Sequence, residues 1–191
     1  MSELEQYITT YFEGVEANEL QTVASYFHPT TLKKGDFFLH EGKVCDKLSF
    51  IHSGILRLYK TMDDGKEVTQ WISTQGYFVT ELSSLLFNAP ARWNIQALTD
   101  AELFTINKKD YEALHKLISR WAEIEKLFIA KCFVMLENRV FTHLSMSAEE
   151  RYELFFDQNR ELFNQIPLQY IASMLGMTPE TFSRVRKKSL R

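Results

Sequence analysis

The chain has 191 residues, of which 45% are hydrophobic and 25% are charged, and its formal net charge is −3 at pH 7. This length and composition are typical of a soluble globular protein with one large domain or two small ones, and the 15 phenylalanines predict an aromatic-rich interior. The weakly negative charge excludes a general attraction to nucleic acid, so any such binding must come from a local basic patch.

The two cysteines, Cys45 and Cys132, form no C-x-x-C pair, so we expect no disulfide framework, zinc site or four-thiolate iron–sulfur cluster. The acidic N-terminus lacks the features of a secretory signal and no stretch has the length of a membrane span, which predicts a cytoplasmic protein. The sequence contains no nucleophile elbow, zinc-protease, P-loop or Rossmann motif. We therefore expect no enzyme, no catalytic residue and no metal site.

Residues 4–27 place apolar side chains at helical spacing, which predicts two short helices that end before Pro29, because a residue that precedes proline disfavours the helical conformation. Residues 30–107 contain five of the seven glycines, and these separate short runs of β character. Such runs with glycine turns predict an antiparallel sandwich or barrel. The predicted strands are FFLH, KLSFIH, ILRLYKT, VTQWIS, YFV, WNIQAL and ELFTIN.

From Lys108 the pattern is helical, with a short helix over KKDYEALHKLI and a long one over residues 119–145, which contain no glycine or proline. One apolar face of the long helix carries Ile129, Phe133, Leu136, Val140 and Leu144, and a second carries Ile124, Phe128, Cys132 and Met135. Two apolar faces predict that one covers the barrel and the other a second copy of the chain, the alternative being a helix buried within one subunit. Residues 146–163 predict one or two further helices, with Ser147 and Glu150 as a capping box.

Residues 166–188, IPLQYIASMLGMTPETFSRVRKK, have the pattern of two helices joined by a tight turn. Gly176 suits the positive φ at the end of the first helix, Thr178 is a good N-cap, and Pro179 fits the first position of the second helix. We expect Phe182 and Val185 to face the first helix, which is the packing pattern of a helix-turn-helix.

The exposed face of the second helix is polar and basic, and its predicted DNA-binding residues are Thr178, Glu180, Thr181, Ser183, Arg184, Lys187 and Lys188. Arg184 suits a bidentate contact to guanine, and Glu180 can accept a hydrogen bond from cytosine. Phosphate contacts are predicted for Ser183, Arg186, Lys187, Lys188 and Arg191. The alternative, that the basic residues only complement the helix dipole, explains two or three of them but not the whole pattern.

A β-barrel, a long helix and a helix-turn-helix in this order resemble the Crp/Fnr family of bacterial transcription regulators over essentially the whole chain. The segment GYFVTELSSLLFNAPARWNIQALTDAELFTINKKDYEAL is similar to the family's phosphate-binding cassette and last barrel strands, and IASMLGMTPETFSRVRKK is similar to its DNA-reading unit. The resemblance implies a homodimer, a near-palindromic site on double-stranded DNA, a small-molecule effector in each barrel and RNA polymerase as a further partner.

The resemblance also implies an effector pocket formed by Val79, Thr80, Glu81, Leu82, Ala91, Arg92 and Trp93. In the family's cyclic-nucleotide binders, a Gly-Glu pair and a later Arg contact the ribose and the cyclic phosphate. Here Thr80 replaces the glycine before Glu81, and Ala91 aligns with the arginine. Arg92 follows one position late, on the opposite face of a strand unless residues 88–90 bend the loop. We therefore expect a pocket for an effector other than cyclic AMP, or one that has lost its ligand, with a cyclic nucleotide as the alternative. The N-terminal cysteines of an iron–sulfur sensor are absent, and the five histidines form no haem motif.

The predicted fold class is α+β. It comprises a sensing barrel with N-terminal helices over 1–117, a dimerisation helix over 118–145 and a helix-turn-helix domain over 146–191 that lacks a full wing, for which the basic tail is expected to substitute in part. The predicted function is a sequence-specific transcription regulator. The alternative is a module that binds a cyclic nucleotide or another small ligand without binding DNA.

Overall fold

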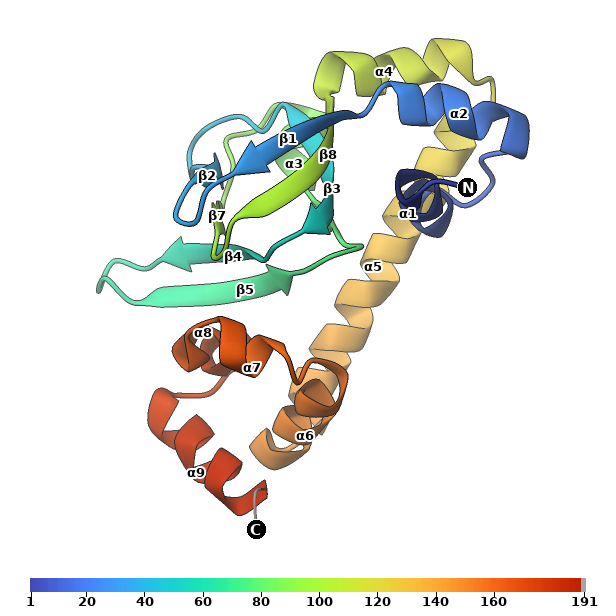
Figure 1. Ribbon diagram of the computed structural model, residues 1–191. Coiled ribbons are helices and arrows are strands. Elements are labelled where there is room, and N and C mark those ends of the chain that lie inside the picture. Colours follow the sequence, from blue (N-terminus) through green and yellow to red (C-terminus); the bar gives the residue numbers. More distant parts are fainter. Residues whose placement is uncertain (190–191) are drawn as a thin grey trace. The chain divides into compact units, whose positions relative to one another are not determined.

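The computed structural model describes residues 1–189, which divide into two compact units (Figure 1). The barrel unit comprises residues 1–58 and 73–133, and the helical unit comprises residues 59–72 and the chain from residue 134 onward. The chain thus combines an N-terminal antiparallel jelly-roll-like domain with a C-terminal helical region. The three domain ranges expected from the sequence stay a prediction.

Two four-stranded sheets form the jelly roll, with strand orders β1-β8-β3-β6 and β2-β7-β4-β5. Their strands are β1 (His28–Leu32), β2 (Phe37–Leu39), β3 (Lys47–Ser53), β4 (Leu56–Thr61), β5 (Glu67–Ser73), β6 (Phe78–Val79), β7 (Asn94–Ala97) and β8 (Ala101–Asn107). The pairs β1–β8, β2–β7, β3–β6 and β3–β8 are antiparallel, in agreement with the prediction from the glycine-punctuated runs.

Two short elements of the barrel unit were not predicted. Strand β1 contains Pro29 and pairs with β8 at the edge of its sheet. Proline lacks a backbone N–H and is tolerated on an edge strand, where that N–H would face solvent. Helix α3 (Leu82–Phe87) lies between β6 and β7 and ends at Asn88, the one non-glycine residue of the described chain with a positive φ, at 56°.

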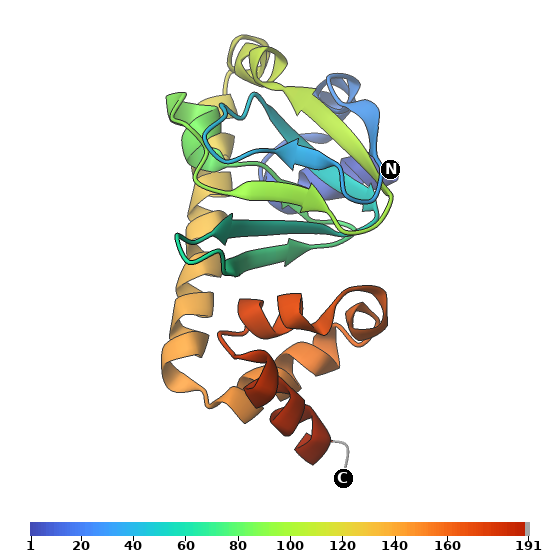
Figure 2. The same ribbon diagram turned by 90° about the vertical axis from the view of Figure 1, so that its left-hand side faces the viewer.

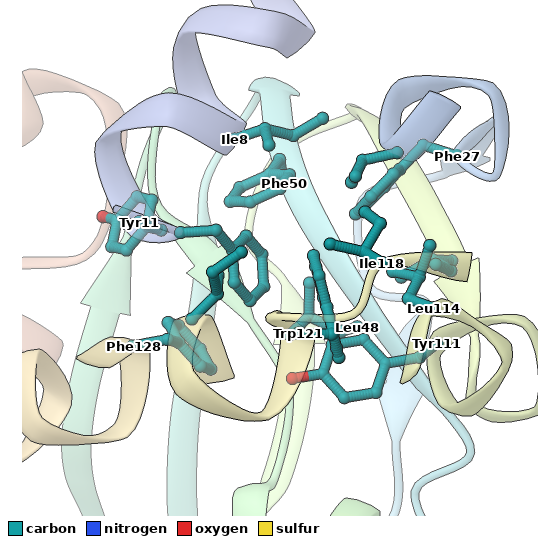
Figure 3. Packing of buried hydrophobic residues seen from close by; sticks show 14 of the residues in the cluster. Ile8, Tyr11, Phe27, Leu48, Phe50, Tyr111, Leu114, Ile118, Trp121 and Phe128 are labelled. Carbon is teal, nitrogen blue, oxygen red and sulfur yellow. The ribbon is translucent and has the colours of Figure 1, made fainter. Parts of the chain in front are cut away.

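The core of the barrel unit is an aromatic cluster between the sheet and the helices (Figure 3). These helices are α1 (Glu3–Tyr11), α2 (Ala17–Ser25), α4 (Lys108–Leu117) and the first half of α5 (Trp121–Ser145). The ring of Phe12 lies 4.7 Å from that of Phe128 and 5.2 Å from that of Trp121, measured between centroids. Burial of each such side chain contributes roughly 1.5–3 kcal/mol, so this cluster anchors the start of α5 to the barrel.

Helix α5 has one apolar face that is buried and one that is exposed. Ile124 and Phe128 have no exposed surface and belong to the aromatic cluster, so theirs is the face that covers the barrel. Four residues of the other face, which we name the exposed stripe, are 49–81% exposed: Phe133, Leu136, Val140 and Leu144. Within residues 1–189 nothing covers this stripe.

The helical unit is built from short helices around a second aromatic cluster. Its helices after α5 are α6 (Ala148–Gln158), α7 (Leu162–Gln165), α8 (Leu168–Met174) and α9 (Pro179–Ser189), drawn in orange to red in Figure 2. The predicted capping box of Ser147 and Glu150 is confirmed at the start of α6. The Tyr152 ring packs against those of Phe163 and Phe182, with centroids 5.7 and 5.4 Å away.

Both cysteines are held in environments that suppress their reactivity. Cys45 is 1% exposed, and its thiol donates to the carbonyl oxygen of Lys47 at 3.3 Å. Cys132 on α5 is half-buried, and desolvation raises the pKa of its thiol to about 11. Cys132 is therefore a neutral thiol at neutral pH, Cys45 is shielded from solvent, and neither forms a disulfide.

Candidate nucleic-acid interface and effector site

The turn between α8 and α9 is a Schellman motif centred on Gly176. The Met177 N–H donates to the Ala172 carbonyl at 2.9 Å, and the Gly176 N–H donates to the Ser173 carbonyl at 3.0 Å. Gly176 has φ +70°, and a Cβ atom there would lie 3.5 Å from the His143 ring. The position expected to favour glycine therefore requires it for its backbone conformation.

Helix α9 begins as the sequence predicts, at Pro179 behind a threonine cap. The Thr178 hydroxyl oxygen accepts a hydrogen bond from the Thr181 N–H at 3.2 Å. Hydrogen bonds from its own N–H and from the Thr178 side chain lower the pKa of the Glu180 carboxyl. Glu180 is therefore an anion at neutral pH and can accept hydrogen bonds.

The inner and outer faces of α9 differ sharply. Phe182 and Val185 are 3% and 4% exposed, and α9 contacts α6 and α8 through this face. On the outer side, six of the seven predicted DNA-binding residues are exposed and Thr181 is half-buried. An open depression runs along this side and is lined by Pro179, Glu180, Ser183, Arg184, Lys187 and Lys188. The structure thus gathers these polar and basic side chains on one accessible surface.

The cations on this surface are not equivalent. The Lys188 ammonium forms an ion pair with the Glu149 carboxylate of α6, with an N–O distance of 2.6 Å. No hydrogen bond or ion pair joins the Arg184 guanidinium to another described residue. The pairing of Lys188 was not predicted, because nothing in the sequence pattern of α6 marks Glu149 as its partner. Arg191, expected to contact phosphate, lies outside the described residues.

The second predicted site centres on Glu81, which caps α3 and is 3% exposed. One carboxylate oxygen accepts from the Ser84 N–H at 2.6 Å and from the Ser83 hydroxyl at 2.9 Å. The other accepts from Nε and Nη2 of Arg92 at 3.2 and 3.1 Å. The structure therefore satisfies both oxygens of Glu81 with groups of the chain itself.

Arg92 reaches Glu81 because it does not lie on a strand. It occupies a bend before β7, after the left-handed turn at Asn88, so the alternation of strand faces does not apply to it. Residues 88–90 thus bend the loop enough to bring Arg92 to Glu81. The Arg92 side chain is 64% exposed although its partner Glu81 is almost fully buried.

The other predicted pocket residues are held by hydrogen bonds and packing within the chain. The buried Thr80 hydroxyl donates to the Lys47 carbonyl at 2.8 Å, and buried Ala91 exchanges backbone hydrogen bonds with the loop at Gly42 and Lys43. Trp93 is half-buried, with its ring centroid 5.8 Å from Cζ of Arg92. Val79 belongs to a second buried apolar cluster of the barrel unit, and Leu82 packs against the aromatic cluster. Ser83 and Ser84 were not predicted as site residues, although Ser84 stands at the spacing of an N-cap partner of Glu81.

Two negative findings concern the part of the chain that the structure describes. Among residues 1–189, no group of three or more His, Cys, Asp or Glu side chains is placed to hold a metal ion. None of the described helices is both long enough and apolar enough to span a bilayer.

Comparison with known proteins relates the barrel to a family. Residues 29–117 match the family model described as cyclic nucleotide-binding domain. The chain is 27% identical to the cyclic AMP receptor protein of Thermus thermophilus in an alignment of 189 residues that covers 91% of this chain and 82% of the relative. The chain therefore contains a cyclic nucleotide-binding domain and is homologous to a cyclic AMP receptor protein.

Solved structures resemble the chain beyond the barrel. The catabolite activator protein of Thermus thermophilus is 25% identical, with a TM-score of 0.58 and coverage of 98% of this chain and 86% of that one. FixK2 from Bradyrhizobium japonicum is 18% identical, with a TM-score of 0.73 and coverage of 85% and 83%. The c-di-GMP-responsive global regulator CLP of Xanthomonas campestris is 17% identical, with a TM-score of 0.68 and coverage of 92% of each chain. The last two comparisons concern the fold alone.

Proposed function

We propose that this protein is a homodimeric, cytoplasmic transcription regulator of the Crp/Fnr type that binds double-stranded DNA through α9. The observation that carries this proposal is the contrast between the faces of α9. Phe182 and Val185 anchor one face, and the predicted reading residues are exposed on the other. The relatives support it, since their names describe a cyclic AMP receptor protein and a catabolite activator protein. RNA polymerase is proposed as a further partner of the DNA-bound dimer.

In the proposed complex, α9 enters the major groove and its side chains divide the work of recognition. Arg184, with no partner among the described residues, donates two hydrogen bonds to O6 and N7 of a guanine. The anionic Glu180 accepts from a cytosine amino group. Thr178 and Thr181 line the entry of the helix. Ser183 and Lys187 contact phosphate, as does Lys188 once it releases Glu149.

The exposed stripe of α5 supplies the proposed dimer contact. A twofold axis would place the stripe of one copy against that of the other, which buries four apolar side chains per chain that water otherwise contacts. The two copies of α9 would then lie about 34–36 Å apart, one turn of duplex, and read the two halves of a near-palindromic site.

Replacement of Arg184 by alanine tests base recognition. We expect a loss of about 1–3 kcal/mol at one base pair of each half-site, with little change at the others. Fluorescence anisotropy with a selected duplex and its single-base variants measures this. The matched variant Lys187→Ala should weaken binding to all sequences alike and make binding less dependent on salt.

Two outcomes would contradict these assignments. Equal weakening of every sequence by Arg184→Ala would mean that Arg184 holds a phosphate. No binding of the wild-type protein to any duplex at low salt would favour the alternative function, a small-ligand module that does not bind DNA, whereas binding that falls steeply with salt supports the regulator.

We also propose that the barrel responds to a small effector other than cyclic AMP. Cyclic AMP would need the Glu81 carboxylate for its ribose and an arginine for its phosphate, but here Glu81 and Arg92 are bound to each other. Any ligand that uses one of these groups must first separate the pair. The proposed pocket comprises Val79, Thr80, Glu81, Leu82, Ala91, Arg92 and Trp93.

Thermal unfolding in the presence of cyclic AMP tests this view. At 1 mM nucleotide we expect stabilisation below about 0.4 kcal/mol, which corresponds to a dissociation constant of about 1 mM or weaker. Stabilisation of about 2.7 kcal/mol or more would require a dissociation constant near 10 µM or tighter and would contradict the proposal. The same titration on Arg92→Ala, which leaves the Glu81 carboxylate bonded to Ser83 and Ser84 alone, shows whether the ion pair itself limits cyclic AMP binding.

A further inference from the structure

We infer that Arg139 of α5 is a positioning residue that fixes the orientation of the reading helix α9, an inference that rests on the proposed DNA-binding function. Arg139 lies in the helical unit, and its Nη2 donates to the carbonyl oxygen of Met174, the last residue of α8, at 3.0 Å. The same guanidinium lies over the Trp71 ring of β5, with Cζ 4.8 Å from the ring centroid. One side chain thus joins three elements of this unit.

The carbonyl that Arg139 holds has no backbone partner of its own. The last carbonyls of a helix lack intrahelical donors, and the Schellman turn satisfies only those of Ala172 and Ser173. The Met174 carbonyl is left to side chains of α5, with Arg139 as its nearer partner, and the Leu175 carbonyl accepts from Nε of Arg151 on α6 at 3.0 Å. Side chains from α5 and α6 therefore complete the cap of α8.

The surroundings of this cap restrict how the turn can move. His143, one helical turn after Arg139, places Nε2 3.3 Å from the Met174 carbonyl oxygen. The Thr69 N–H of β5 donates to the Ser173 hydroxyl at 2.9 Å, on the same last turn of α8. Burial lowers the pKa of Arg139 to about 10, so the guanidinium remains cationic at neutral pH. Its positive charge stabilises the C-terminus of α8, which is the negative end of the helix dipole.

This arrangement links the reading helix to α5. Helix α9 begins only a few residues after Met174, so a shift of that carbonyl changes the direction in which α9 leaves the turn. Arg139 precedes Val140 of the exposed stripe, so the proposed dimer contact and the side chain that holds the Met174 carbonyl lie on the same turn of α5. Base contacts need α9 placed accurately, whereas phosphate contacts tolerate small rotations. Loss of the Arg139 link should therefore reduce sequence selectivity more than general affinity.

The test compares Arg139→Met and Arg139→Lys with the matched control Arg160→Met in the full-length protein. Arg160 also lies over an aromatic ring, 5.4 Å from that of Phe156, and is paired with Asp157, but it does not contact the turn. We expect Arg139→Met to weaken binding to the selected duplex about tenfold, with less than about twofold change for a random duplex. Arg139→Lys should be intermediate, since lysine keeps a charged donor but loses the planar stack. The preference for one half-site spacing should broaden, and Arg160→Met should resemble the wild type.

The results separate this inference from the proposed function. We compare the affinity for the selected duplex with that for the random duplex. If folded Arg139→Met leaves this ratio unchanged, the role of Arg139 is overturned and DNA binding stands. If Arg139→Met does not fold, the same comparison is made on Arg139→Lys. If the wild type binds no duplex, the proposed DNA-binding function is wrong. Hydrogen exchange of the Gly176 and Met177 amides then tests whether Arg139 holds the turn between α8 and α9. Faster exchange in the Arg139 variants but not in Arg160→Met supports the link, and equal exchange overturns it.

Discussion

Val140→Asp is expected to convert the protein from a dimer into a monomer and to abolish tight DNA binding. Val140 lies in the middle of the exposed stripe, so in the proposed dimer each copy would place an unpaired carboxylate in an apolar contact, next to its symmetry mate. The cost of an uncompensated buried charge is about 3–5 kcal/mol, which weakens association by more than about 100-fold. Sedimentation velocity over a range of concentrations measures the change in mass.

Asn138→Asp is the matched control for this prediction. Two residues along a helix correspond to a rotation of about 200°, so residue 138 lies on nearly the opposite side of α5 from Val140. This variant adds the same charge two residues away and should leave the association constant and DNA affinity within about twofold of the wild type. A Val140→Asp protein that sediments as a dimer would show that the stripe is not the contact between copies.

Phe182→Ala is expected to destabilise the helical unit by about 3–5 kcal/mol, because it removes a ring that is 3% exposed and packed between Tyr152 and Phe163. The depression along α9 would lose its support, and DNA binding should fall in proportion to the folded fraction. Urea unfolding followed by circular dichroism measures the loss of stability.

Phe87→Ala provides the comparison for this substitution. Phe87 is 77% exposed at the end of α3, so the same change of side chain there should cost less than about 0.5 kcal/mol. Similar unfolding midpoints for Phe182→Ala and the wild type would mean that Phe182 does not anchor α9, and would remove the main support for its reading face.

Elements with local signals were predictable from the sequence. The start of α9 was predicted because Thr178, Pro179 and the apolar pair Phe182 and Val185 are all read within eight residues. Strand β1 was missed because its side chains are almost all exposed and therefore show no alternation of buried and exposed positions. Helix α3 was missed because it has only six residues and is capped by Glu81, a residue type less common at that position.

The partners of several site residues could not be predicted from the sequence, because they come from distant parts of the chain. The partners of Arg139 and Lys188 lie 35 and 39 residues away, and no periodicity joins residues across such distances. The bonding of Arg92 to Glu81 depends on the backbone of a loop rather than on residue types, so the alignment alone left two orientations open. Local sequence patterns therefore indicate which surface carries the site, and tertiary packing decides which of its side chains are already paired within the protein.

The shielding of both native thiols has a practical consequence. With Cys45 enclosed and Cys132 held as the neutral thiol, an additional cysteine at an exposed position of α9, such as Ser183, would be the preferred target of a thiol-directed spin label without removal of the native residues. Pulsed electron resonance on such a labelled sample would report the separation of the two labels in solution. The same sample, with and without a candidate small molecule, would reveal whether that molecule alters the spacing.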